Sequence, residues 1–404
     1  MDGGTLAILI REDDEDDGLE VADLESTEEL GSDGVGREAV FMRVPAAPDE
    51  VVVLVGTRLQ RLLGRTKARA CVHRVVGPGQ NHAEDRMPSF LYSQFFVRPS
   101  YPEQSFADQT VLVTGANVGL GLEAARHVVR LGAARVILAV RNVPAGEEAK
   151  KNIETSTGRR VCEVWEVDLA SYKSVVSFGD RIAQLPRLDA AILNAAVATR
   201  NFEVAEGFER TITVNVVSTL LLSLFVLPVL KATKKKIPES QPRLTFVVSE
   251  VHAWVGLPEW KSDNILQTLS NQSTAKMSER YPLSKLLEVL LVQELAGRVR
   301  GSEVIINMIN PGLCHSALGR EGGLSFYLFK LILARSTEVG SRTLVAGISA
   351  GLESHGAYMS DGHVENTAFS QFVRSDEGRQ ARLKLWDEVS AILEAVRPGI
   401  MQNV

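Results

Sequence analysis

Hydrophobic positions from residue 106 onward alternate between short β-branched runs and longer stretches with helical spacing. The short runs predict strands at residues 110–114, 135–140, 161–168, 188–194, 244–249 and 304–310. Apolar residues that recur every three or four positions predict helices at residues 120–131, 145–155, 171–185, 216–232 and 278–300. Two more helices are predicted at residues 336–350 and 380–396, with a last strand within residues 356–362.

Most of these predicted strands are apolar along their whole length, which is typical of strands that are buried on both faces. Strands and helices that alternate in this way form a parallel sheet wrapped by helices through right-handed crossovers. We therefore predict an α/β fold, a single doubly wound Rossmann-type domain with a parallel sheet of about seven strands.

The first 86 residues differ from the rest in charge and pattern. Residues 1–50 hold sixteen acidic side chains against three arginines, and residues 51–86 hold seven basic side chains against two acidic ones. Their apolar positions show no clear period, so the segment buries too little surface to offset the entropy of ordering it. We expect residues 1–86 to be an acidic, disordered extension and residues 87–404 to be the Rossmann-type domain. Met87 would serve as an internal start, and we expect residues 1–86 to be dispensable for the chemistry; a regulatory acidic tail is the alternative.

Composition, charge and cysteine spacing argue against several classes of protein. A chain that is 45% hydrophobic and 23% charged is globular, and its net charge of -6 argues against nucleic-acid binding through the overall field. Its three cysteines lie far apart without the spacing of a zinc site, so we expect no metal and a reducing compartment. The first residues resemble no import signal, so we expect a cytoplasmic protein.

The longest uncharged apolar stretch, residues 216–230, contains Pro228. It is shorter than the roughly 20 residues that a membrane-spanning helix needs. We therefore predict a buried helix here and no transmembrane segment.

A glycine-rich turn follows the first predicted strand and opens the first predicted helix. Glycines at 115, 119 and 121 give the spacing Gly-x-x-x-Gly-x-Gly. Glycine lets the backbone turn tightly and approach a pyrophosphate, whose charge then faces the free N–H groups of the helix. We predict a dinucleotide site here; a tight turn without a ligand is the alternative. Its candidate residues are Thr114, Gly115, Asn117, Gly119, Leu120 and Gly121.

Polar residues follow the next three predicted strands. Arg141 ends the second, where a guanidinium favours the 2′-phosphate of NADP(H) over the free ribose of NAD(H); a merely solvated arginine is the alternative. Asp168 ends the third strand, where its carboxylate can meet an adenine amino group. Asn194 ends the fourth, where the backbone can flank the adenosine ribose.

Tyr281 and Lys285 are one helical turn apart and share a face. An adjacent cation lowers the pKa of a phenol from its reference value of about 10, and chemistry at an alcohol or carbonyl needs such a proton donor. Ser249 ends the fifth strand, at the edge where α/β sheets bind ligands, and can hydrogen-bond the same oxygen. Asn215 is a polar residue in an apolar run, which indicates burial; a satisfied helix-start amide is the alternative.

These motifs together resemble the short-chain dehydrogenase/reductase family, especially its retinol-dehydrogenase-like branch and fungal members of secondary metabolism. The resemblance covers residues 90–396. It rests on motifs in the family's order: Thr-Gly-x-x-x-Gly-x-Gly at 114–121, Asp168 with Leu169, Asn194 with Ala195, Asn215, Ser249, Tyr281 with Lys285, and Pro311 with Gly312.

The resemblance implies a catalytic tetrad. Tyr281 would be the acid–base and Ser249 would orient the substrate oxygen. Lys285 would lower the phenol pKa and hold the nicotinamide ribose, and Asn215 would fix a water that relays protons to Lys285. The resemblance places these further residues against the cofactor: Leu169, Ala195, Pro311, Gly312 and Ser316.

The resemblance implies an NADP(H)-dependent oxidoreductase that transfers a hydride to or from an alcohol or ketone carbon of a hydrophobic small molecule, in secondary-metabolite biosynthesis. The apolar residues 324–334 resemble a substrate-covering helix, with peripheral membrane contact as the alternative. An inserted loop between Ser249 and Tyr281 would carry Trp254 and Trp260 beside the substrate. The same site would suit an enoyl-type reductase or isomerase, or a non-catalytic dinucleotide-binding scaffold. Family members often form homodimers.

Overall fold

The computed structural model describes residues 20–22, 41–43, 72–74, 86–315 and 333–404. The chain divides into two compact units, Met1–Val97 and Arg98–Val404. In the first unit, three short strands form an antiparallel sheet of order β2-β1-β3, and a helix follows them. The disorder expected for residues 1–86 falls mainly on positions outside the described residues. The described elements of this unit are β1 (Glu20–Ala22), β2 (Phe41–Arg43), β3 (Val72–Arg74) and α2 (Arg86–Phe96).

An eight-stranded sheet forms the centre of the second unit, with the order β13-β12-β11-β10-β7-β4-β5-β6. All its neighbouring strands run parallel except for the edge strand β13, which pairs antiparallel with β12. The predicted doubly wound parallel sheet is confirmed. Its strands are β4 (Thr110–Thr114), β5 (Arg135–Val140), β6 (Cys162–Glu166), β7 (Ala190–Leu193), β10 (Arg243–Val247), β11 (Ile305–Asn310), β12 (Tyr358–Ser360) and β13 (His363–Val364).

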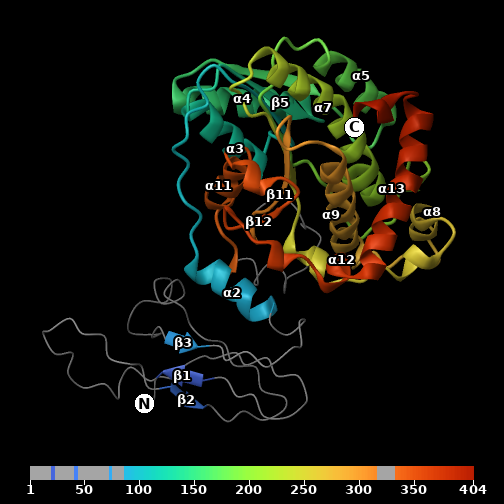
Figure 1. Cartoon of the computed structure of the whole chain (residues 1–404). Helices are drawn as coiled ribbons and strands as arrows, with labels where there is room; N and C mark the ends of the chain where they lie inside the picture. The colour runs from blue at the N-terminus through green and yellow to red at the C-terminus, as the bar shows by residue number, and fades with distance from the viewer. Residues whose placement is uncertain (1–19, 23–40, 44–71, 75–85, 316–332) are drawn as a thin grey trace, which may run out of the picture. The chain divides into compact units, whose positions relative to one another are not determined.

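Helices cover both faces of this sheet, with α3 and α11 on one side and α9 and α13 on the other (Figure 1). The first face carries α3 (Gly119–Arg130), α4 (Val143–Thr157) and α11 (Thr337–Gly347). The second face carries α5 (Tyr172–Ile182), α7 (Thr219–Lys236) and α9 (Arg280–Arg298), with α13 (Asp376–Val396) packed on α9.

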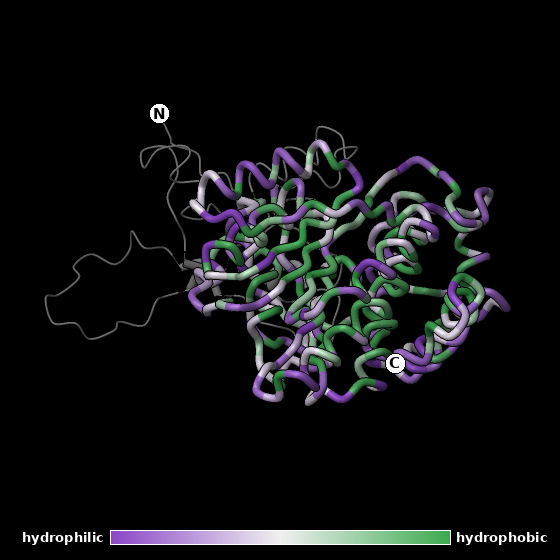
Figure 2. Tube along the Cα trace, turned by 90° about the horizontal axis from the view of Figure 1, so that it is seen from above, coloured by the Kyte–Doolittle hydropathy of each residue, from purple (hydrophilic) through white to green (hydrophobic). Residues whose placement is uncertain are grey.

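The strands are apolar along their length because their side chains enter two separate cores. On β4, Leu112 packs into the cluster on the α7 and α9 side, whereas Val111 and Val113 pack into the cluster on the α3 side. Figure 2 shows hydrophobic positions gathered in the interior and polar positions along the outer helices. Burial on both faces thus explains the continuous apolar runs of the sequence.

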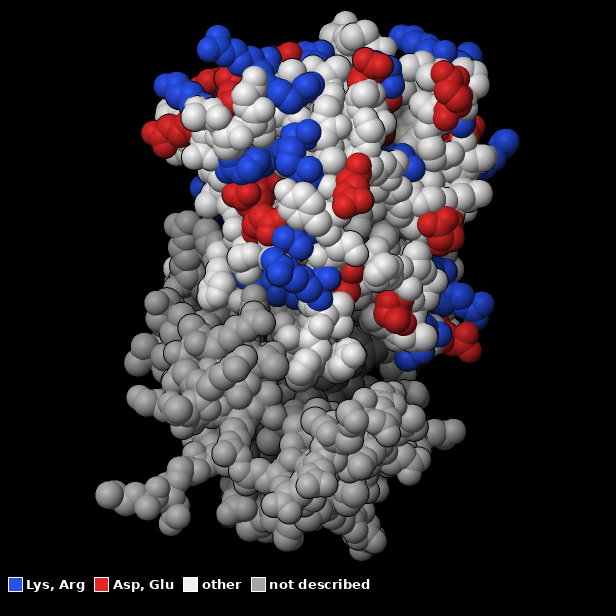
Figure 3. Space-filling view, turned by 90° about the vertical axis from the view of Figure 1, so that its left-hand side faces the viewer, with Lys and Arg blue, Asp and Glu red and all other residues white. Residues whose placement is uncertain are grey.

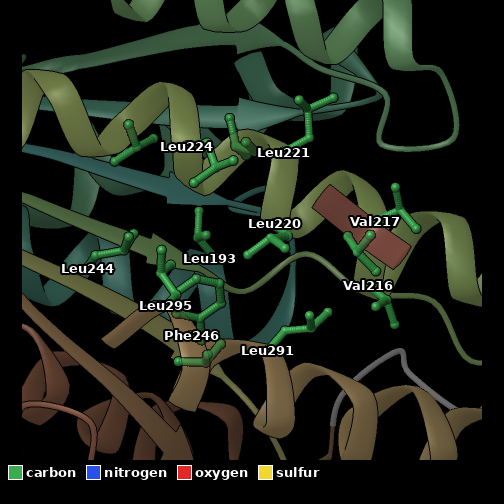
Figure 4. Packing of buried hydrophobic residues seen from close by; sticks show 14 of the residues in the cluster. Leu193, Val216, Val217, Leu220, Leu221, Leu224, Leu244, Phe246, Leu291 and Leu295 are labelled. Atoms are coloured by element: carbon green, nitrogen blue, oxygen red, sulfur yellow. The ribbon is translucent and has the colours of Figure 1, made fainter. Parts of the chain in front are cut away.

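The longest apolar helical stretch, Arg210–Lys236, is the one described helix with the length and composition to cross a membrane, and 94% of its apolar window is buried inside the protein. It consists of α6 (Arg210–Ile212), the π-helical segment η1 (Thr213–Ser218) and α7. Figure 4 shows its leucines facing Leu193, Leu244 and Phe246 of the sheet and Leu291 and Leu295 of α9. The predicted buried helix is confirmed, and it begins earlier than residue 216.

Short elements complete the second unit. Residues between β10 and α9, predicted as an inserted loop, contain two 3₁₀ segments and a short helix. Over the described residues of the face in Figure 3, Lys and Arg are interspersed with Asp and Glu. The short elements are the hairpin strands β8 (Val204–Ala205) and β9 (Phe208–Glu209), η2 (Glu250–Ala253), η3 (Pro258–Lys261), α8 (Ile265–Leu269), η4 (Leu352–Ser354), η5 (Asn366–Ala368), α12 (Gln371–Arg374) and η6 (Ile400–Asn403).

Candidate active site

The turn between β4 and α3 requires glycine. Gly115 and Gly119 have φ angles of 66° and 65°, in the left-handed region that favours glycine. A Cβ on Gly121 would lie 2.5 Å from the carbonyl oxygen of Gly115, so no side chain fits there. Val118, which precedes α3, offers no side-chain cap to the first N–H groups of the helix. These groups and the helix dipole can therefore hold an anion such as a pyrophosphate.

Thr114 ties this turn to the end of β7. Its hydroxyl oxygen accepts hydrogen bonds from the backbone N–H groups of Asn194 and Ala195, both at 2.9 Å. The Asn194 amide nitrogen donates in return to the Thr114 carbonyl oxygen at 2.9 Å. The structure therefore brings together the predicted cofactor residues of two neighbouring strands. Asn117 and Leu120, also predicted there, are half-buried in the same turn and helix start.

At the ends of β5 and β6, Arg141 is exposed, and the next residue, Asn142, caps α4 by accepting from the Ala145 N–H at 3.1 Å. Asp168 is half-buried, and its Oδ1 accepts from the Ala170 N–H at 2.9 Å. One carboxylate oxygen of Asp168 therefore stabilises its own turn. Leu169 is buried, with 6% of its surface exposed.

Tyr281 and Lys285 lie near the start of α9. The Lys285 Nζ is 5.9 Å from the centre of the Tyr281 ring. The same ammonium is buried and donates to the Val247 carbonyl oxygen and to Glu288 Oε2, each at 2.7 Å. The helix thus places phenol and ammonium side by side as the spacing predicts, and it adds a carboxylate that sequence reasoning missed.

The pKa of Tyr281 lies above its ordinary value. Burial raises it, Lys285 lowers it, and Glu288 raises it further. The lowering effect expected of Lys285 is therefore present, but burial and the negative charge of Glu288 outweigh it, and the net pKa of Tyr281 is raised. Helical spacing shows neither the partial burial of this tyrosine nor the neighbouring carboxylate.

The pKa of Lys285 is raised. Burial lowers it, and the charges of Glu288 and Tyr281, with the hydrogen bond to Glu288, more than compensate. Burial raises the pKa of Glu288, and Lys285 opposes that rise. Because the ammonium at 2.7 Å supplies the counter-charge, we take the pair as ionised.

Ser249 lies two residues beyond the end of β10 and is half-buried. Its Oγ accepts from the Val251 N–H at 3.5 Å, and its carbonyl oxygen lies 2.7 Å from His252 Nδ1. The Ser370 N–H donates to His252 Nε2 at 3.3 Å, so the ring proton is on Nδ1 and is donated to Ser249. The fully buried His252, which sequence reasoning missed, therefore holds the segment that carries Ser249.

Asn215 lies in the π-helical segment and is 1% exposed, as its apolar surroundings in the sequence indicate. Its side chain accepts from the Val197 N–H and donates to the Val197 carbonyl oxygen, both at 2.9 Å. It also donates to Ser284 Oγ at 2.9 Å. Asn215 thus joins α9 to the chain that leaves β7.

The chain after β11 contains the predicted nicotinamide loop. Pro311 is buried, and Gly312 has a φ of 71° while its N–H donates to Asn310 Oδ1 at 3.1 Å. Ser316 and most of residues 324–334 lie outside the described residues. Asp168, Asn194, Ser249 and the segment from Pro311 thus follow the carboxyl ends of parallel strands, where α/β sheets bind ligands. Asn215 lies in η1, and Tyr281 and Lys285 lie in α9.

Comparisons with known proteins show which proteins this chain is similar to. A family model for short chain dehydrogenases matches residues 109–237. The chain is 45% identical over 323 residues to the short-chain dehydrogenase anuD of Penicillium roqueforti, covering 77% of this chain and 84% of that protein. It is 45% identical over 324 residues to the short chain dehydrogenase/reductase dmxR8 of a Cryptosporiopsis species, covering 78% and 99%. Among solved structures, an uncharacterized protein from Mycobacterium paratuberculosis is similar with a TM-score of 0.54 and 25% identity, covering 72% and 96%.

Proposed function

The chain belongs to the short-chain dehydrogenase/reductase family, an oxidoreductase family that uses a nicotinamide cofactor, and on that basis we propose that it interconverts an alcohol and a ketone of a hydrophobic small molecule with NADP(H). The observation that carries the proposal is the Tyr281 phenol beside the buried Lys285 ammonium, on a helix that packs against η2, the segment that Ser249 caps. We further propose that the protein is cytoplasmic and acts in secondary-metabolite biosynthesis.

The residues present fit a dinucleotide. The position of Gly121 has no room for a Cβ, and the start of α3 lacks a side-chain cap, so backbone N–H groups are left for the pyrophosphate. The turn of residues 114–121 would hold the pyrophosphate, and Asp168 and Asn194 would flank the adenosine. When bound, the nicotinamide supplies or accepts the hydride.

Preference for NADP(H) rests on Arg141. It is exposed just after the end of β5, and the next residue, Asn142, is the N-cap of α4. A guanidinium at this position can form a charge-assisted fork with a 2′-phosphate, whereas a carboxylate there would repel it.

The chain's own residues handle the proton and the substrate oxygen. In ketone reduction the Tyr281 hydroxyl donates its proton to the carbonyl oxygen, and in alcohol oxidation the phenolate takes that proton back. The Ser249 hydroxyl donates a hydrogen bond to the same oxygen and orients it. The Lys285 ammonium stabilises the phenolate because it lies on the same face of α9.

An apolar substrate is supported by the segment between Ser249 and Tyr281. Trp254 is 50% exposed, and Trp260 packs partly buried against the core on the α7 side. Exposed aromatic surface close in sequence to Ser249 suits a ligand with an apolar body.

The test is a panel of hydrophobic ketones and secondary alcohols, assayed by the absorbance of the reduced nicotinamide with NADPH or NADH, with products identified by mass spectrometry. We expect turnover at a carbonyl or carbinol carbon, faster with NADPH. If the products instead show reduction of a carbon–carbon double bond, or isomerisation, the protein is an enoyl-type reductase or an isomerase. Cofactor binding without turnover would favour a non-catalytic scaffold.

A further inference from the structure

Glu288 is a buried acidic residue on α9, the helix that carries Tyr281 and Lys285. It is 4% exposed and lies three positions after Lys285, between the apolar residues Leu287 and Val289, which are fully buried. Burying a carboxylate is costly unless a partner compensates its charge. Leucine or valine would fill the same place without that cost, so we expect the charge itself to serve a purpose.

The carboxylate acts on Lys285. Its Oε2 accepts a hydrogen bond from Lys285 Nζ at 2.7 Å, and the Val247 carbonyl oxygen accepts a second one at 2.7 Å. An ammonium has three N–H donors. Because two of these N–H groups bind partners that are held in place, the direction of the third N–H group is fixed as well.

Resting on the proposed function, we infer that Glu288 is a positioning residue for the reaction: it fixes the Lys285 ammonium and balances its charge beside Tyr281. In this arrangement α9 carries a line of three groups, the Tyr281 phenol, the Lys285 ammonium and the Glu288 carboxylate. The strength with which the ammonium favours phenolate then depends on the carboxylate behind it.

Electrostatic effects support this arrangement. The negative charge of Glu288 raises the pKa of Tyr281, against the lowering effect of Lys285, and it also raises the pKa of Lys285. Removing that charge should therefore lower the pKa of both groups. Phenolate would then form at lower pH.

Charged groups on the elements packed against α9 have partners of their own. Arg382 of α13 pairs with Glu294 at 3.1 Å, and Arg210 of α6 pairs with Glu203. On η2, His252 bonds to Ser249 and Ser370, and Glu250 is half-buried. The described segments η1 and β11 carry no charged residue. Apart from burial, the charges that shift the pKa values of Tyr281 and Lys285 are accordingly those of Tyr281, Lys285 and Glu288 themselves.

The first variant is Glu288→Gln, which keeps the shape and an acceptor oxygen but removes the charge. We expect kcat to fall about tenfold to a hundredfold, as when a reacting group is misplaced, with KM for the substrate little changed. The limb of the pH–rate profile that reports Tyr281 should move to lower pH. Glu147→Gln is the control, because Glu147 pairs with Lys150 at the same three-residue spacing but on the surface of α4; its kinetics and pH profile should match the wild type.

A second measurement does not depend on turnover. The ultraviolet absorbance of tyrosinate, taken as the difference between each protein and its Tyr281→Phe version, reports the titration of Tyr281 directly. We expect this titration to move to lower pH in Glu288→Gln. Absence of turnover by the wild type would count against the proposed function, while this titration would still decide the role of Glu288.

The inference is overturned if folded Glu288→Gln matches the wild type in both the pH profile and the tyrosinate titration. If Glu288→Gln does not fold, Glu288→Asp decides. That variant keeps the charge but withdraws it by one methylene, so kcat should fall while the Tyr281 titration stays near that of the wild type. Unchanged kcat in Glu288→Asp would overturn the inference.

Discussion

The Asn215 amide nitrogen donates a hydrogen bond of 2.9 Å to the Ser284 hydroxyl oxygen, one position before Lys285. Ser284 in turn donates to the Tyr281 carbonyl oxygen at 2.8 Å. Because Asn215 also bonds to both backbone groups of Val197, one buried amide fixes the first turn of α9 against the chain that leaves β7. The placement of Tyr281 and Lys285, the proposed proton-transfer residues, therefore depends on Asn215.

Replacing Asn215 with alanine tests this placement. The change leaves the partly buried Val197 N–H and carbonyl without their partner, which costs about 1–3 kcal/mol of unfolding free energy. We expect kcat to fall as well, because the start of α9 loses an anchor. Denaturant unfolding and steady-state assays measure both. The exposed Asn201→Ala is the control, with a change within about 0.5 kcal/mol; equal stability of the two variants would contradict the anchoring role.

Two glycine-to-alanine substitutions test the turn of residues 114–121 as the pyrophosphate site. One lies in that turn, and the other, in α9, is the control. In Gly121→Ala the new Cβ would meet the Gly115 carbonyl oxygen at 2.5 Å and the Asn194 amide nitrogen at 2.7 Å, so the turn must distort. We expect lost stability and weaker binding of NADPH, measured by its fluorescence. In Gly297→Ala, at an exposed position of α9, the new Cβ meets nothing within 4 Å, so the change should stabilise the protein by about 0.5–1 kcal/mol. Unchanged NADPH binding by Gly121→Ala would argue against this turn as the pyrophosphate site.

Arg141→Glu tests the cofactor preference. Loss of a charge-assisted bond and gain of repulsion should raise KM for NADPH about tenfold or more, while KM for NADH should change little or fall. The exposed Arg379→Glu, on α13, is the matched control. If Arg141→Glu retains the NADPH to NADH ratio of the wild type, another group recognises the phosphate.

The proposed dispensability of residues 1–86 is tested by a chain that starts at Met87. All described candidate residues lie in the unit Arg98–Val404. We expect kcat and KM within about twofold of the full chain, because no described site residue is removed. A large loss of turnover in a folded, NADPH-binding truncated protein would assign the extension a part in catalysis.

The sheet could be predicted from the sequence because its strands are buried on both faces. Strands β4 and β5 lie at the predicted residues, since Val111, Leu112 and Val113 enter cores on opposite sides. The edge strand β13 could not be predicted, because two exposed residues, His363 and Val364, carry no apolar pattern. The start of the long apolar helix at Arg210 was also missed, since polar residues interrupt its first turns.

The proximity of Tyr281 and Lys285 could be predicted from the sequence, but the electrostatics around them could not. Spacing alone placed Tyr281 and Lys285 together on α9, as the structure has them. The raised pKa of Tyr281 follows from burial, which spacing does not reveal. Glu288 has the spacing of a Lys partner, but a glutamate on a helix is usually solvated, and its burial appears only once α9 is packed against the core. His252 gives no sequence pattern at all.

The most direct measurement of the central claim, that Tyr281 carries the proton, compares Tyr281→Phe with the wild type in NADPH binding and in turnover. The change removes one hydroxyl and keeps the ring. We predict NADPH affinity within about twofold, since the pyrophosphate turn is untouched, and a fall in kcat of about 10²- to 10⁴-fold, the usual contribution of a general acid–base. Turnover by Tyr281→Phe equal to that of the wild type would contradict the account.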